Sequence, residues 1–170
     1  MFKLMSLAFN NQGDIPKQFS CQGEGISPPL MWSGAPLKTK SYALIIVDYD
    51  AQASAGFPVI HWVAYNIASG NNKLDMGVAA DIAMGLNSYG DACYVGMNPP
   101  PGQAHQYFFC LYALDVEKLD VGRSPTALQL AKAMSGHVLD QTVLVANYKR
   151  QNPQADLSAI DHSLLKKRKQ

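Results

Sequence analysis

The segment that decides the fold class runs from residue 42 to residue 50, Tyr42-Ala43-Leu44-Ile45-Ile46-Val47-Asp48-Tyr49-Asp50. Its first six residues are apolar without alternation and rich in aromatic and β-branched side chains. Such a short continuous run predicts a strand that is buried on both faces. The run ends abruptly in two aspartates, so the sequence predicts acidic side chains at the end of an interior strand.

Three further segments, 59–67, 106–114 and 142–146, are predicted as strands by the same criteria. One helix is predicted from about Pro125 to Leu139, with Ser124 as its N-cap and Gly136 weakening its end. Segments 10–36 and 68–104 are rich in Gly, Pro, Asn and Ser and are predicted as long loops. The pattern therefore indicates a mainly β protein with one principal helix near the C-terminus.

The composition suits one soluble domain. A chain of 170 residues can bury a sizeable core without a disulfide or a metal. The net charge of +1 gives no overall field that would attract nucleic acid or an acidic membrane. The apolar stretches are too short for a membrane span, and the N-terminus does not look like a signal peptide. Three cysteines without metal-ligand spacing favour a reduced, cytoplasmic protein, although a Cys21–Cys93 bridge stays open.

The chain divides into a domain at 1–151 and a basic C-terminal extension at 152–170. The extension ends in Lys166-Lys167-Arg168-Lys169, and its apolar residues could lie along one side of a short helix. A solvated, frayed tail is the alternative that we favour.

Asp48 and Asp50 stand two residues apart at the end of the first strand. In an extended chain these positions face the same side, where two carboxylates would need cations or hydrogen-bond donors around them. The simpler alternative is that one aspartate caps a turn and the other is exposed.

His61 lies within an otherwise apolar strand, and alternation would place it on the same face as Val63 and Tyr65. A lone histidine in such a place is more often a satisfied core residue than a functional one. Its ring nitrogens nevertheless need partners, and a nearby aspartate would favour the imidazolium form.

His105 begins the third strand, directly after Pro99-Pro100-Pro101-Gly102. Three prolines fix three φ angles, so this loop is stiff before any ligand arrives. The alternative is a rigid connection without a further role.

Taken together, these segments resemble the phosphatidylethanolamine-binding proteins, in the bacterial and archaeal branch often called Raf-kinase-inhibitor-like. The resemblance covers about residues 6–150. The matching segments, in the family's order, are Ile26 to Pro36, Asp48-Tyr49-Asp50-Ala51, His61-Trp62, Pro99 to Gly102 and His105-Gln106-Tyr107. Five ordered motifs are far more specific than one short pattern.

The resemblance implies an antiparallel β-sandwich with a pocket at one end that takes phosphate, phosphoryl head groups or carboxylates. It implies a binding protein that needs neither catalysis nor a cofactor, with a homodimer and a kinase or protease partner as further expectations. The residues that would line or support the pocket are Asp48, Asp50, His61, Trp62, Pro99, Pro100, His105 and Tyr107.

The sequence departs from the family pattern near this pocket. Tyr49 and Gln52 stand where the family commonly has prolines, and Gln106 stands where it has an arginine. The last change removes a positive charge beside the pocket.

A metal-dependent hydrolase is the alternative function, because two aspartates and two histidines are plausible ligands for Zn²⁺ or Mn²⁺. The anion hypothesis predicts instead that binding weakens as the histidines lose their protons, near pH ~6.5.

Overall fold

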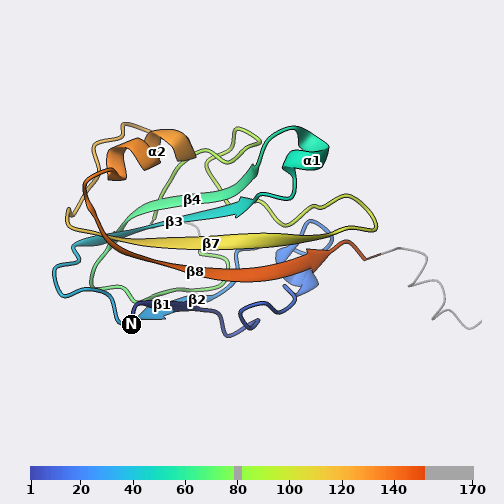
Figure 1. Ribbon diagram of the computed structural model, residues 1–170, viewed down its shortest axis with the longest axis horizontal. Helices are drawn as coiled ribbons and strands as arrows, with labels where there is room; N and C mark the ends of the chain where they lie inside the picture. The colour runs from blue at the N-terminus through green and yellow to red at the C-terminus, as the bar shows by residue number, and fades with distance from the viewer. Residues whose placement is uncertain (79–81, 152–170) are drawn as a thin grey trace, which may run out of the picture.

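The computed structural model describes residues 1–78 and 82–151, and within them two antiparallel β-sheets pack face to face (Figure 1). The larger sheet has the strand order β6-β4-β3-β7-β8 and the smaller one β1-β2-β5. The strands are β1 (Lys3–Met5), β2 (Leu30–Ser33), β3 (Ser41–Asp48), β4 (Val59–Ala68), β5 (Lys73–Leu74), β6 (Ala83–Met84), β7 (Ala104–Leu114) and β8 (Val138–Lys149). Two α-helices, α1 (Gln52–Ala55) and α2 (Ala127–Met134), and a 3₁₀ turn at Lys17–Phe19 complete the described part.

Strand β3 lies at the centre of the larger sheet, and all eight of its residues are buried. Its alternate side chains serve two apolar clusters. Leu44 and Ile46 join the larger cluster, which fills the space between the two sheets. Ile45 and Val47 join a smaller cluster together with Leu130 of α2, which covers the other face of the sheet (Figure 1). The predicted double burial of this strand is confirmed.

A β-bulge interrupts the pairing of β3 with β4. Ile46 lies opposite Trp62 and Val47 opposite Ile60, so His61 is the extra residue on β4. An extra residue shifts the alternation of the strand. Ile60 and Trp62, which a regular strand would place on the same face, consequently pack on opposite faces, Ile60 against the smaller cluster and Trp62 within the larger one.

Helix α2 is shorter than the sequence predicted and begins later. Thr126 is its N-cap, in a reciprocal capping box with Gln129, so the predicted cap at Ser124 is wrong. Ser124 has a φ of 45° and lies outside the helix. The helix ends at Met134, Gly136 takes a φ of 83°, and the chain enters β8 at Val138. The glycine therefore separates two elements.

The two segments predicted as loops contain short strands. Residues 10–36 include β2, and residues 68–104 include β5 and β6. The first two of these belong to the smaller sheet, which the sequence did not predict strand by strand. The described part holds no helix of the length and apolarity that crossing a membrane requires. The three cysteines are free, so the Cys21–Cys93 bridge is not formed. The extension at 152–170 lies outside the described residues.

Candidate functional site

Asp48 and His105 form a buried pair at one end of the larger sheet. Asp48 is the last residue of β3 and lies opposite Tyr107 of β7, two residues after His105. His105 Nδ1–H donates to Asp48 Oδ2 over 2.7 Å, and each residue is 3% exposed. A buried carboxylate next to a ring N–H is stabilised by this bond, which also fixes the ring's orientation.

The two aspartates have different positions. Asp48 Oδ1 accepts the Ala51 N–H at 3.1 Å and thereby holds the turn into α1. Asp50 is exposed, and its Oδ2 accepts the Gln106 N–H at 2.8 Å. The chain turns at Tyr49 and is no longer extended, so the structure agrees with the simpler alternative, in which Asp48 caps a turn and Asp50 is exposed. Asp50 ties that turn to β7.

His61 reaches the same region because of the bulge in β4. Its ring packs edge-on against Tyr107, with centroids 5.3 Å apart, and Tyr107 belongs to the larger cluster. The prediction that His61 shares a face of the strand with Val63 and Tyr65 is therefore wrong. His61 Nδ1–H donates to the carbonyl oxygen of Val95 at 2.9 Å. The aspartate that was expected to orient this ring pairs with His105.

Burial lowers the pKa of His61 below its ordinary value of 6.5, although the Val95 carbonyl and the charge of Asp48 oppose this shift. His61 is therefore neutral at pH 7, whereas the sequence had suggested an imidazolium. With its proton on Nδ1, the ring presents an unprotonated Nε2 that can accept a hydrogen bond.

Tyr107 supplies a hydroxyl that is ready for a partner. The residue is completely buried, and its hydroxyl has no hydrogen-bond partner within residues 1–78 and 82–151. Burial, followed by the charge of Asp48 and a hydrogen-bonding contribution from the same carboxylate, raises the pKa of Tyr107, so the group stays protonated and can donate. The Asp48 carboxylate is therefore close to this hydroxyl, although the two do not meet the geometry of a hydrogen bond. An unsatisfied buried donor costs about 1–3 kcal/mol, which makes it unusual in a folded protein.

Trp62 is also fully buried, and its indole N–H likewise has no partner in the described part of the chain. Its ring packs edge-on against Tyr94 at a centroid distance of 5.7 Å. Pro99 is buried and Pro100 half-buried, in the loop that runs from Met97 to His105. These residues frame the region rather than form its polar centre.

We call Asp48, His61, His105 and Tyr107 the His61–His105 site. The Nδ1 atoms of His61 and His105 are hydrogen-bonded to Val95 and Asp48. Within the described residues, the Nε2 atoms of both rings and the Tyr107 hydroxyl have no hydrogen-bond partner. The role of the Val95 backbone carbonyl could not be predicted from the sequence, since no residue type marks a carbonyl that binds a side chain. Among the described residues, no three His, Cys, Asp or Glu side chains are arranged to hold a metal ion. The hydrolase alternative thus gains no support.

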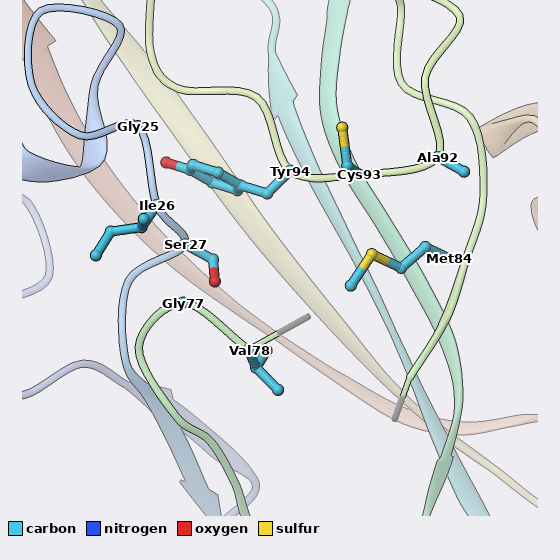
Figure 2. A pocket seen from close by; sticks show the side chains of 9 residues that line it. All are labelled: Gly25, Ile26, Ser27, Gly77, Val78, Met84, Ala92, Cys93 and Tyr94. Atoms are coloured by element: carbon cyan, nitrogen blue, oxygen red, sulfur yellow. The ribbon is translucent and has the colours of Figure 1, made fainter. Parts of the chain in front are cut away.

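A separate cavity of about 230 Å³ lies between the segments at 25–27, 77–78, 84 and 92–94 (Figure 2). None of the predicted site residues lines it. Met84 and Tyr94 extend over this space, and Ser27 contributes a buried hydroxyl without a partner in the described residues. We assign this cavity no role.

The chain was compared with known proteins. Residues 5–149 match the family model described as phosphatidylethanolamine-binding protein. A UPF0098 protein of Methanothermobacter thermautotrophicus is 41% identical over 153 residues, which cover 86% of this chain and 98% of that protein. UPF0098 proteins of three Chlamydia species are 39% identical over 150 residues, which cover 87% of this chain and 99% of each of those proteins.

Solved structures give the same result. A crystal structure from Chlamydia trachomatis, described as a homologue of phosphatidylethanolamine-binding proteins, superposes with a TM-score of 0.82 and 38% identity. The alignment covers 88% of this chain and 98% of that one. YbcL of Escherichia coli, described as a member of the mammalian family, has a TM-score of 0.80 and 25% identity, with 88% and 99% of the two chains covered.

Proposed function

Because this chain belongs to the phosphatidylethanolamine-binding protein family, we propose that its His61–His105 site binds a small anion. The ligand would be phosphate, the phosphoryl part of a head group or a carboxylate. The observation that supports this most is the fully buried Tyr107 hydroxyl, which lacks a partner among the described residues beside two oriented histidines. An anionic oxygen would satisfy that donor.

The polar groups of the site suit an anion that still holds a proton. Neutral His61 presents Nε2 as an acceptor, because its Nδ1–H is bound to Val95. The P–O–H group of monohydrogen phosphate or of a phosphomonoester could donate to that nitrogen, and another oxygen could accept from Tyr107. Hydrogen bonds with one ionised partner are about twice as strong as neutral ones.

Asp48 at first appears unsuited to an anion site, since like charges repel. Its Oδ2 accepts from His105 and its Oδ1 from the Ala51 backbone, so both oxygens are already bonded. With Nδ1–H donated to Asp48, the His105 ring would separate this carboxylate from a ligand that is hydrogen-bonded at Nε2. This role needs binding alone and no chemical step.

Calorimetry of the full chain with inorganic phosphate, phosphoethanolamine and acetate tests the proposal. We expect His105→Asn to weaken binding by at least tenfold, since it removes Nε2, whereas its amide can still donate to Asp48 in place of Nδ1. His137→Asn is the matched control: His137 Nδ1 lies 2.9 Å from Asp115 Oδ1, in a half-exposed pair outside the site. Equal binding by both variants, or no binding by the unmodified chain, would show that the proposal is wrong.

A further inference from the structure

Arg150 lies just beyond the end of β8 and holds its guanidinium against two uncharged groups. NH1 donates to Asn98 Oδ1 at 2.6 Å and lies 3.3 Å from Cys21 Sγ. The thiol of Cys21 in turn lies 3.1 Å from the same amide oxygen. The guanidinium is therefore fixed by contacts that do not neutralise its charge.

No carboxylate in the described ranges forms an ion pair with Arg150. The ion pairs found there are Lys73–Asp75, His105–Asp48 and His137–Asp115. A guanidinium presents several N–H donors in one plane, and Asn98 and Cys21 use only part of them. The side chain thus combines a fixed direction with an unused positive charge and unused donors.

A strand register, a sequence neighbourhood and a backbone hydrogen bond place this group near the His61–His105 site. The pairing of β7 with β8 sets Tyr148 opposite His105, so Arg150 follows two residues beyond that position. Asn98 directly precedes the proline loop that leads to His105. The Cys21 N–H donates to the Met97 carbonyl at 3.0 Å, two residues after the carbonyl of Val95 that holds His61.

The segment that holds His61 packs directly on the segment that contains Cys21. At Gly96 a Cβ would come within 2.7 Å of the Cys21 backbone nitrogen, so only glycine permits this approach. Cys21 also makes a small contribution to the raised pKa of Tyr107, in agreement with this close packing. Cys21, Asn98 and Arg150 therefore border the site.

We propose that Arg150 is the specificity-determining cation of this site and makes it prefer phosphoryl groups to carboxylates. The inference rests on the proposed function and deepens it. A phosphate or phosphomonoester has three or four free oxygens around a tetrahedral centre. Such a ligand can bond to the buried groups of the site with some of its oxygens and present the remaining oxygens to Arg150. A carboxylate has two oxygens and can satisfy only one of these regions fully. Guanidinium also matches phosphoryl oxygens geometrically, often with two parallel bonds.

The test is calorimetry of the full chain at constant ionic strength with inorganic phosphate, phosphoethanolamine and sodium acetate. The variants are Arg150→Gln, Arg150→Lys and, as matched control, Lys149→Gln. Lys149 is the exposed neighbour of Arg150 and lies opposite Ala104. We expect Arg150→Gln to weaken phosphate binding by about tenfold or more and acetate binding by less than about threefold.

Arg150→Lys keeps the charge but loses the planar donor geometry, so we expect an intermediate loss for phosphate. It also serves as the test variant if Arg150→Gln does not fold. Lys149→Gln should stay within about twofold of the unmodified chain for both anions. If Arg150→Gln loses affinity for phosphate and for phosphoethanolamine equally, Arg150 recognises the phosphoryl group itself. A larger loss with one of the two would show whether the ligand is free phosphate or a head group.

Two results would overturn the inference and differ from failure of the proposed function. In the first, Arg150→Gln binds phosphate as tightly as Lys149→Gln does, and in the second it loses affinity for phosphate and for acetate by the same factor. In either case the unmodified chain binds anions and Arg150 does not select among them. If the unmodified chain binds neither anion, the proposed function itself is wrong, and this inference fails with it.

Discussion

At the scale of single residues, Tyr107 shows how function and stability oppose each other. Its buried hydroxyl lacks a partner in the described residues, whereas the Tyr148 hydroxyl contacts both Ser20 and Gln22. We expect Tyr107→Phe to raise the free energy of unfolding by about 1 kcal/mol, because an unsatisfied donor is removed. The same variant should weaken phosphate binding. Urea denaturation followed by fluorescence measures the first effect.

Tyr148→Phe is the matched control for that measurement. It removes a hydroxyl that donates to Gln22 at 2.6 Å and accepts from Ser20 at 2.8 Å, so we expect a loss of about 1 kcal/mol. A destabilisation of Tyr107→Phe equal to that of Tyr148→Phe would mean that the Tyr107 hydroxyl already has a stabilising partner.

His61 predicts how stability depends on pH. Its pKa is lowered from 6.5 in the folded protein, mainly by burial. Below pH 6.5 the unfolded chain therefore binds a proton that the folded chain does not yet bind, and stability falls as the pH decreases. The contribution approaches about 1.4 kcal/mol per pH unit until the folded pKa is reached.

Thermal or urea unfolding between pH 5 and 7.5 checks this contribution by comparing the unmodified chain with His61→Asn, whose amide lies where Nδ1 does and can still donate to Val95. The variant should lose less stability on acidification. NMR titration of the His61 ring gives an independent reading, and a midpoint at or above 6.5 would contradict the account.

The residue types of the site could be predicted from the sequence, but their partners could not. Asp48, His61, His105 and Tyr107 do come together, as the resemblance implied. The sequence assigned the aspartate to His61, whereas the structure assigns it to His105. Alternation along β4 fails at the bulge, and no residue in that segment marks an extra position. A ring held by a backbone carbonyl leaves no sequence signal either.

At the scale of elements, α2 depends on the capping box at its start. Thr126 Oγ1 accepts the Gln129 N–H at 3.2 Å, and Gln129 Oε1 accepts the Thr126 N–H at 2.9 Å. We expect Thr126→Ala to destabilise the protein by about 1 kcal/mol. Ser124→Ala, at the cap predicted from the sequence, should change stability by less than about 0.5 kcal/mol. If chemical denaturation shows a larger loss of stability for Ser124→Ala than for Thr126→Ala, Ser124 is the N-cap after all.

The difference in the helix start has a physical cause. Ser124-Pro125 has the chemistry of an N-cap followed by a first helical residue, and so has Thr126 with Gln129 three residues later. Local preference alone does not decide between them. In the structure the Pro125 carbonyl accepts the Leu86 N–H, so tertiary pairing holds Pro125 outside the helix. The strongly apolar strands offered no such alternative and were predicted, although β8 spans Val138–Lys149 and so extends well beyond the predicted 142–146 at both ends.

At the scale of the whole molecule, the two-sheet arrangement agrees with the family and with the solved structures that superpose on it. The central strands could be predicted because both of their faces are apolar. The smaller sheet could not, because β2 and β5 are four and two residues long and lie within Gly- and Pro-rich segments. Their pairing is decided by long-range contacts.

The division into a domain and an extension predicts the effect of truncation. Strand β8 ends at Lys149, and the family match ends at the same residue. We expect the chain shortened to residues 1–151 to melt within about 2 °C of the full chain, since it keeps both apolar clusters. Calorimetric melting of the two chains checks this. A fall of more than about 5 °C would show that residues 152–170 belong to the folded domain.

The most direct test of the anion site is an NMR titration of the histidine rings with inorganic phosphate at pH 6.5. The His61 and His105 signals should shift together and saturate at the same concentration, because one ligand contacts both rings. His137, whose ring pairs with Asp115 outside the site, should remain unchanged. Saturating shifts at His61 and His105 alone would support the account. Unchanged signals at both, or equal shifts at His137, would contradict it.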